Sequence, residues 1–172
     1  NERKLIIDEP TYLDVIKLKT AKTFAFCTRI GAICAQALTD QEEALDVFGE
    51  KLGMIFQLKD DIFDYFDQKR IGKPTGNDLK EGKMTLPLIY ALNQAPYNQS
   101  KPILNIIRNK DFTHEKLAAI NRFVKEYHGV EYAEQLMEKY REEALTSLAI
   151  FPDSDFKQAL IRCVDYFMSR EY

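Results

Sequence analysis

A long helical pattern from Asp40 to about Gln68 constrains the fold of this chain most. Asp40 can cap a helix, with Glu43 three residues further on. At 1.5 Å per residue the helix would be roughly 40 Å long. Gly49 and Gly53 would each cost about 1 kcal/mol of helix propensity, which indicates close approach of another helix or a ligand. Because the pattern is so long and so apolar, we expect this helix inside a bundle.

Three carboxylates lie near the end of this pattern, at Asp60, Asp61 and Asp64. On a helix, Asp60 and Asp64 share one stripe with Gln57, and Asp61 lies at its edge. Like charges at these spacings repel by roughly 0.2–0.5 kcal/mol per pair. Mg²⁺ would relieve this repulsion, because it takes one or two carboxylates and completes its coordination with water and substrate phosphates.

A lone Asp-Asp-x-x-Asp also occurs on solvated helix surfaces, so the motif alone leaves both interpretations open. The residues around it leave no broad polar face, which favours carboxylates that line a cavity. These flanking residues are Leu52, Ile55, Phe56, Ile62, Phe63 and Phe66.

The rest of the chain also has helical periodicity, and no segment alternates with period two, so we predict an all-α fold. With 172 residues and 45% hydrophobic content, residues 1–172 should form a single helical domain. We expect further helices at Pro10–Leu38, from Met84 through Leu92, at Lys101–Asn109, His114–Tyr127 (with Gly129 just past its end), Val130–Ile150 and Ser154–Arg170.

Lysines outside the carboxylate motif are candidates for binding a phosphate. The stretch Lys69–Lys83 is rich in glycine and cations and reads as a loop. It is either a solvated loop or a lid whose Lys73 and Lys83 reach a phosphate. Lys19, next to Thr20 on the first predicted helix, is either a surface lysine or part of the same site.

Composition excludes several classes of function. A net charge of -3 gives no general attraction to nucleic acid. The presence of only two histidines argues against a histidine metal site or a Ser-His-Asp triad.

The three cysteines form no Cys-x-x-Cys pair, and we expect buried, reduced thiols. No uncharged window of 18 apolar residues is present, which predicts a cytoplasmic protein without a transmembrane segment.

These motifs together resemble the C-terminal half of trans-type polyprenyl diphosphate synthases, especially the long-chain, octaprenyl-type members. The family's second aspartate-rich motif is matched by Phe56-Gln57 followed by Asp60-Asp61-Ile62-Phe63-Asp64, and its Lys-Thr pair by Lys19-Thr20. The stretches Gly72–Pro87 and Asp165–Arg170 are similar to the family's loop and C-terminus.

The resemblance implies part of an isoprenoid-synthase-type helical bundle that elongates an allylic prenyl diphosphate with isopentenyl diphosphate, using Mg²⁺. It also implies a homodimer, with transient membrane contact during product release. The implied metal ligands are Asp60, Asp61 and Asp64. The implied catalytic residues are Lys19, Thr20, Gln57 and Asp60, and the implied substrate-binding residues are Lys19, Thr20, Gln57, Lys73 and Lys83.

Several family features are missing from the chain. The first aspartate-rich motif, the arginine pair after it and the N-terminal residues that bind isopentenyl diphosphate do not occur. We therefore expect an inactive fragment whose N-terminal half is absent. The alternatives are a non-catalytic partner subunit of a heteromeric synthase and, with less support, a terpene cyclase. Product length cannot be read from these residues.

Overall fold

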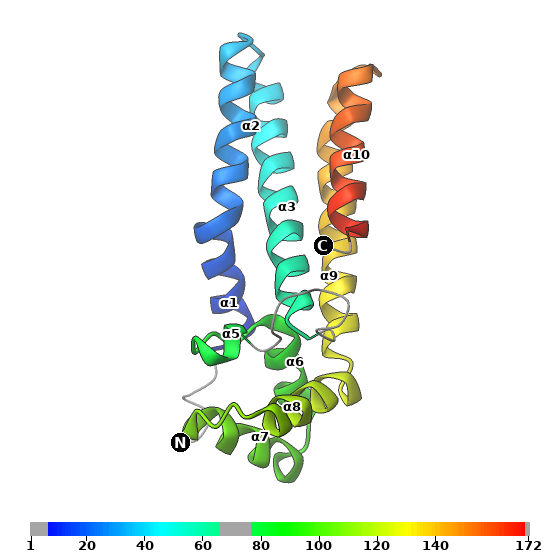
Figure 1. The fold of residues 1–172 in the computed structure, drawn as a ribbon. Helices are drawn as coiled ribbons and strands as arrows, with labels where there is room; N and C mark the ends of the chain where they lie inside the picture. Colours follow the sequence, from blue (N-terminus) through cyan, green and yellow to red (C-terminus); the bar gives the residue numbers. More distant parts are fainter. Residues whose placement is uncertain (1–6, 66–76, 171–172) are drawn as a thin grey trace. The chain divides into compact units, whose positions relative to one another are not determined.

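The computed structural model describes residues 7–65 and 77–170. All regular elements in these two ranges are helices, and neither range contains a strand, which confirms the predicted all-α class. In chain order the helices are α1 (Glu9–Ile16), the π-helix η2 (Lys17–Ala21), α2 (Lys22–Cys34), α3 (Thr39–Phe63), α5 (Asn77–Lys80), α6 (Leu86–Gln94), α7 (Tyr97–Asn109), α8 (His114–Glu126), α9 (Gly129–Ser147), the 3-10 helix η3 (Leu148–Ile150) and α10 (Asp155–Ser169) (Figure 1).

Several helix boundaries differ from those predicted; for example, α7 begins at Tyr97, four residues before the predicted Lys101. The first helix ends at Cys34 rather than Leu38, since Gln36 adopts a left-handed conformation with φ of 53°. The helix α3 ends at Phe63, before the predicted Gln68, which lies outside the described residues. The predicted loop up to Lys83 contains the short helix α5.

Gly129 begins α9 instead of following the end of the preceding helix. His128 takes the left-handed position between α8 and α9, with φ of 55°. A Cβ atom at Gly129 would lie 2.1 Å from the Pro87 carbonyl oxygen. Close packing against α6, and not a helix-ending conformation, is therefore the reason for a glycine here.

The chain divides into two compact units, which share α1, α3 and α9. The first unit comprises Asn1–Tyr12 and Asp60–Glu134, and the second Leu13–Lys59 and Gln135–Tyr172. In the first unit, α6 and α7 pack against α8. Their buried residues include Leu88, Ala91, Leu92, Ile103, Leu104, Leu117, Ile120, Phe123 and Val124. The prediction of a single domain stays a prediction.

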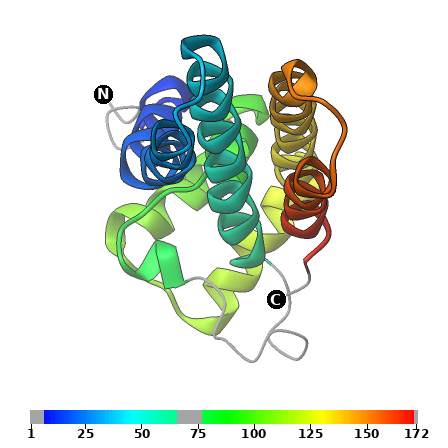
Figure 2. The ribbon, with the colours of Figure 1, turned by 90° about the horizontal axis from the view of Figure 1, so that it is seen from above.

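The helices α2 and α3 pack closely in the second unit, where they run side by side (Figures 1 and 2). A Cβ atom at Gly49 would lie 2.6 Å from the Phe24 carbonyl oxygen, and one at Gly53 would lie 2.6 Å from the Ala21 Cα. This contact confirms the close approach predicted from the two glycines on α3.

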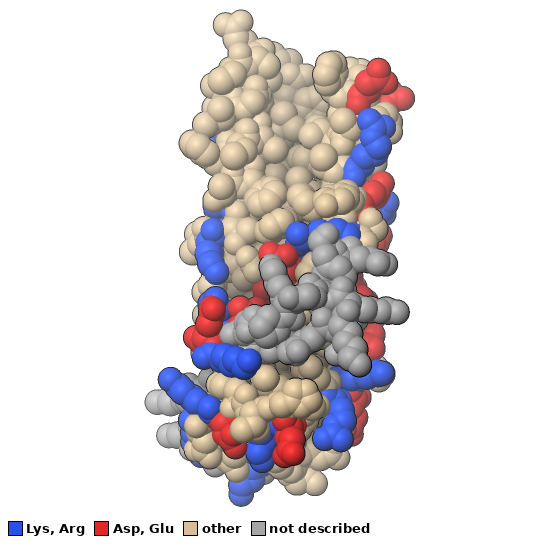
Figure 3. Space-filling model, viewed as in Figure 1, with Lys and Arg blue, Asp and Glu red and all other residues tan. Residues whose placement is uncertain are grey.

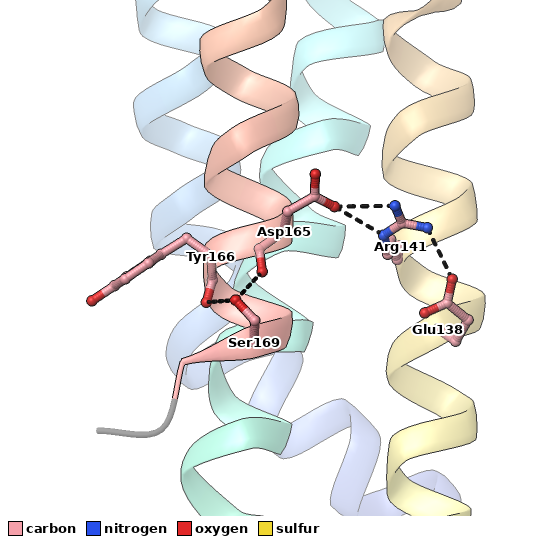
Figure 4. A network of polar contacts seen from close by, with 5 residues as sticks. All are labelled: Glu138, Arg141, Asp165, Tyr166 and Ser169. Atoms are coloured by element: carbon pink, nitrogen blue, oxygen red, sulfur yellow. Dashed lines mark hydrogen bonds and ion pairs between the residues drawn. The ribbon is translucent and has the colours of Figure 1, made fainter.

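A polar network holds α10 against α9 in the same unit (Figure 4). The Arg141 side chain donates hydrogen bonds of 3.2 Å and 3.0 Å to one carboxylate oxygen of Asp165, and a third of 3.0 Å to Glu138. The Ser169 hydroxyl donates to the Asp165 carbonyl at 2.8 Å. The two hydrogen bonds from Arg141 to Asp165 link α10 to α9, whereas the contacts of Glu138 and Ser169 each lie within one helix.

One face of the second unit carries few charged side chains (Figure 3). On α2 and the preceding η2, Leu18 is 72% exposed and Phe26 65% exposed. The second unit also has a hollow of about 470 Å³, formed by the end of α2, the start of α3 and residues from and before α10. It is lined by Thr28, Gly31, Ala32, Ala35, Gln36, Ala37, Gln41, Leu45, Phe151 and Leu160. Exposed apolar surface of this kind is typical of interaction sites.

The three cysteines are more exposed than the sequence predicted. Cys27, Cys34 and Cys163 are free thiols, as predicted, but all three are exposed rather than buried. Cys27 and Cys34 lie seven residues apart on the outer side of α2, which the α2–α3 contact leaves open.

Candidate active site

The three predicted carboxylates lie at the end of α3 but differ in exposure. Asp60 and Asp61 belong to the last turn of the helix, whereas Asp64 follows its final residue, Phe63. Asp60 is exposed and Asp64 half-buried, whereas Asp61 is only 4% exposed. The three acids therefore do not share one apolar environment as the helical pattern suggested.

Asp61 accepts a hydrogen bond from the buried Tyr12 hydroxyl of α1, 49 residues away in sequence. Burial, together with the negative charge of Asp61, raises the pKa of Tyr12, so the phenol keeps its proton and can donate it. Sequence reasoning missed Tyr12, because no local spacing relates it to the aspartates.

A second tyrosine of the first unit, Tyr65, is hydrogen-bonded to a threonine. The hydroxyls of Tyr65 and Thr85 are 2.8 Å apart. Burial raises the pKa of Tyr65, and the charges of Asp64, Asp61 and Asp78 add to the shift, while the Thr85 hydrogen bond opposes it. Both tyrosines around the aspartates are thus held neutral.

Thr20 and Gln57 meet in the second unit. The Thr20 hydroxyl donates a hydrogen bond of 2.7 Å to the Gln57 side-chain oxygen of α3. Thr20 and Lys19 belong to the π-helix η2, a distortion that is frequent at functional sites. Lys19 is exposed. The structure therefore joins two of the residues that the sequence singled out, although they lie 37 residues apart.

Two lysines beside this pair bind one glutamate of α3. The ammonium groups of Lys17 and Lys22 lie 2.9 Å and 2.7 Å from the carboxylate oxygens of Glu50, whose side chain is 14% exposed. Burial would raise the pKa of Glu50, but the hydrogen bonds from Lys22 and Lys17 outweigh it and lower that pKa. The Glu50 carboxylate consequently ties η2 and α2 to α3.

Glu50→Gln is expected to lower the free energy of unfolding by about 1 kcal/mol at pH 7, because a partly buried, doubly paired carboxylate is lost. A group with a lowered pKa in the folded state stabilises fully above its unfolded value of 4.5. The difference from wild type should therefore shrink as the pH falls below that value. Urea unfolding at pH 7 and below pH 4 measures it.

Glu138→Gln is the matched control, since Glu138 forms an exposed pair with Arg141. It should cost no more than a few tenths of a kcal/mol. Equal effects of the two variants, or a Glu50→Gln effect independent of pH, would contradict the assignment.

The ammonium group of Lys83 forms ion pairs with acidic side chains that lie near it in the sequence. Its ammonium group lies 3.6 Å from an Asp78 carboxylate oxygen and also pairs with Glu81. The hydrogen bond that Lys83 donates to Glu81 is the main cause of the raised pKa of Lys83. Lys73 lies outside the described residues. To bind a phosphate, Lys83 would exchange these carboxylates for the ligand.

The predicted site residues thus fall into two groups. The first unit contains Asp60, Asp61, Asp64 and Lys83, and the second contains Lys19, Thr20 and Gln57. Within residues 7–65 and 77–170, no three acidic, histidine or cysteine side chains come together in a way that could hold a metal ion. In the same ranges, no helix is both long and apolar enough to cross a bilayer.

Known proteins resemble this chain in sequence and in fold. The polyprenyl synthetase family matches residues 1–124. The octaprenyl diphosphate synthase of Haemophilus influenzae is 34% identical over 95% of this chain and 50% of its own length. The short chain isoprenyl diphosphate synthase of Methanocaldococcus jannaschii is 36% identical over 94% of this chain and 49% of its own length.

A solved structure agrees with these relatives. The polyprenyl synthase from Caulobacter crescentus CB15, complexed with calcium and isoprenyl diphosphate, superposes with a TM-score of 0.90 and 30% identity. The superposition covers 98% of this chain and 52% of that one, so the chain spans about half the length of the relatives it matches. The helical bundle and the family resemblance predicted from the motifs are therefore confirmed. By its sequence match and its fold, the chain belongs to the polyprenyl synthetase family.

Proposed function

We propose that this chain is the C-terminal part of a prenyltransferase that elongates an allylic diphosphate by condensation with isopentenyl diphosphate. The hydrogen bond from Thr20 to Gln57 carries the proposal, because it joins two motifs that belong to the family resemblance. Family membership and the solved relative with bound isoprenyl diphosphate support it. Since the chain spans about half of its relatives, we expect it to need a further part for turnover.

The carboxylate oxygens of the three aspartates are suitable ligands for a divalent metal ion. Asp60 and Asp64 would hold Mg²⁺ directly and Asp61 through water, since Asp61 is buried and already accepts from Tyr12. A magnesium site of this type needs only one or two carboxylates, because water and substrate phosphates fill the other positions. When bound, the metal would supply positive charge to the departing diphosphate. The calcium in the Caulobacter crescentus relative supports a divalent ion.

The remaining residues would act on the substrates themselves. Lys19, Lys73 and Lys83 would bind the diphosphate and stabilise its growing negative charge. The carbon–oxygen bond of the allylic diphosphate breaks, isopentenyl diphosphate attacks the allylic cation, and the departing diphosphate accepts the proton that is lost. The polar groups of Thr20 and Gln57 would line the site near the reacting carbons.

A chimaera tests the proposal: this chain joined to the N-terminal half of the Haemophilus influenzae octaprenyl diphosphate synthase. It should consume isopentenyl diphosphate in the presence of Mg²⁺ and form linear prenyl diphosphates. The double variant Asp60→Asn and Asp64→Asn should lower turnover by at least about 100-fold, since the leaving group loses its charge stabilisation. Asp155→Asn, an exposed acid in the first turn of α10, is the control and should leave turnover unchanged.

Other outcomes would identify the alternatives. A folded chimaera without turnover contradicts the enzymatic proposal. Turnover that does not respond to the Asp60→Asn and Asp64→Asn substitutions would favour a non-catalytic subunit. Cyclic hydrocarbon products would indicate a terpene cyclase.

We also infer a cytoplasmic homodimer that contacts membranes transiently to release its product. The exposed apolar side chains of α2 support a subunit interface. The two relatives compared with this chain are named as a short chain and an octaprenyl synthase, so similarity to them assigns no product length.

A further inference from the structure

Arg170 connects the end of α10 to the middle of α3. Its Nη2 donates a hydrogen bond of 3.0 Å to the Phe56 carbonyl oxygen, 114 residues away in sequence. The guanidinium carbon lies 4.4 Å from the centroid of the Phe56 ring and 5.6 Å from that of Phe167. A planar cation that both donates to a backbone oxygen and stacks on aromatic rings is held in one orientation.

The two rings that this guanidinium contacts form a cluster with a third, that of Phe24. The Phe56 centroid is 5.4 Å from those of Phe24 and Phe167, and the Phe24 and Phe167 centroids are 6.2 Å apart. The rings come from α2, α3 and α10, so the cluster joins these three helices.

The cluster lies next in sequence to the pair of polar residues singled out above. Phe56 directly precedes Gln57, and Phe24 lies four residues after Thr20. A Cβ atom at Gly53, one turn before Gln57, would lie 3.1 Å from the Phe24 Cδ2 atom, so the Phe24 ring packs closely against this turn of α3. The turns of α3 that contain Gly53 and Gln57 are therefore in contact with Phe24 and Thr20.

The hydrogen bond from Arg170 acts on the helix backbone itself. A helical carbonyl accepts from the amide four residues on and has a second lone pair available. A charged donor at this second position is stronger than a neutral one, and it fixes the tilt of the peptide group between Phe56 and Gln57. The direction in which the Gln57 side chain leaves α3 depends on that tilt.

We propose that Arg170 is a positioning residue that holds Gln57 in place to accept the Thr20 hydrogen bond. It acts from the C-terminus of the chain through the Phe56 carbonyl and the three aromatic rings. The use of the Thr20–Gln57 pair in prenyl transfer rests on the proposed function, but its placement by Arg170 does not.

The experiment compares Arg170→Met with Arg141→Met in the full chain. Methionine keeps apolar contact with the rings but cannot donate to the carbonyl. Arg141 also contacts α10, through its hydrogen bonds to Asp165, and its third hydrogen bond goes to Glu138 of its own helix, so it is a matched control (Figure 4). The measurements are the side-chain amide signals of Gln57 in nuclear magnetic resonance spectra and hydrogen exchange of the backbone amides of residues 54–59.

Arg170→Met should shift the Gln57 side-chain signals and increase exchange at residues 54–59 by about tenfold, relative to the change elsewhere in the chain. Arg141→Met should change neither the Gln57 side-chain signals nor the exchange at residues 54–59, relative to the rest of the chain. Arg170→Lys should recover part of the Gln57 shift, because an ammonium group can donate to the same carbonyl.

The same response to Arg170→Met and Arg141→Met would overturn the proposal and assign Arg170 a general structural role. Failure of Arg170→Lys to recover any of the shift would also overturn it. Because these measurements use no substrate, their result is separate from that of the chimaera. An inactive chimaera together with a specific Gln57 response would overturn the proposed function alone.

Discussion

Replacing Gly49 by alanine is expected to lower the free energy of unfolding by about 3 kcal/mol. The new Cβ atom would lie 2.2 Å from the Thr28 Oγ1, 2.6 Å from the Phe24 carbonyl oxygen and 2.7 Å from the Ala25 Cα. Two of these three atoms belong to the α2 backbone, so the helices must move apart to admit a methyl group, and overpacking of this kind is costly. Against a typical total stability of about 5–15 kcal/mol, the loss is large.

Gly31→Ala is the matched control, because a Cβ atom at Gly31 would meet no atom within 4 Å. Gly31 is an exposed residue inside α2, where alanine has the higher helix propensity. This variant should raise the free energy of unfolding by about 0.5–1 kcal/mol. Urea unfolding followed by circular dichroism measures both variants, and a Gly49→Ala protein as stable as Gly31→Ala would contradict the packing of α2 on α3.

Tyr12→Phe is expected to lower the free energy of unfolding by about 2 kcal/mol. The substitution removes the hydroxyl that donates to the buried Asp61 carboxylate and leaves the ring in its position. Hydrogen bonds to charged groups contribute about 1.5–3 kcal/mol, because the buried charge otherwise loses the solvation that water would provide.

Tyr65→Phe tests whether the charge of the acceptor is responsible. The Tyr65 hydroxyl is bonded to the neutral Thr85 hydroxyl in the same unit. Its loss should cost about 1 kcal/mol, as for a neutral pair. Urea unfolding of the two variants decides the question, and a Tyr65→Phe effect equal to or larger than that of Tyr12→Phe would argue against a charge-assisted bond at Asp61.

Local sequence patterns predicted the parts of the fold that depend on near neighbours in the chain. The absence of period-two alternation predicted an all-helical protein, and the predicted helix from Ser154 to Arg170 is present as α10, with Ser154 as its N-cap. Gly49 and Gly53 predicted a close helix contact, because a glycine inside an otherwise strong helical pattern needs a reason. The motifs around Gln57 and Lys19 identified the family, since they occur at characteristic spacings.

The end of α3 shows where local patterns were insufficient. The apolar pattern continues beyond Asp64, yet the helix ends at Phe63, and the three aspartates differ widely in exposure. Burial of Asp61 depends on Tyr12, which comes from a different helix. Periodicity describes which residues share a face of one helix and carries no information about what covers that face.

By itself, the sequence determined the helical class, the family and the chemical character of the candidate site, because each of these depends on residue type and short-range spacing. Only the tertiary structure decided which partners these residues have. Asp61 meets Tyr12 across 49 residues, and Phe56 meets Arg170 across 114. Such contacts follow from the packing of whole helices, which is the sum of many weak interactions over the entire chain, so no local pattern predicts them.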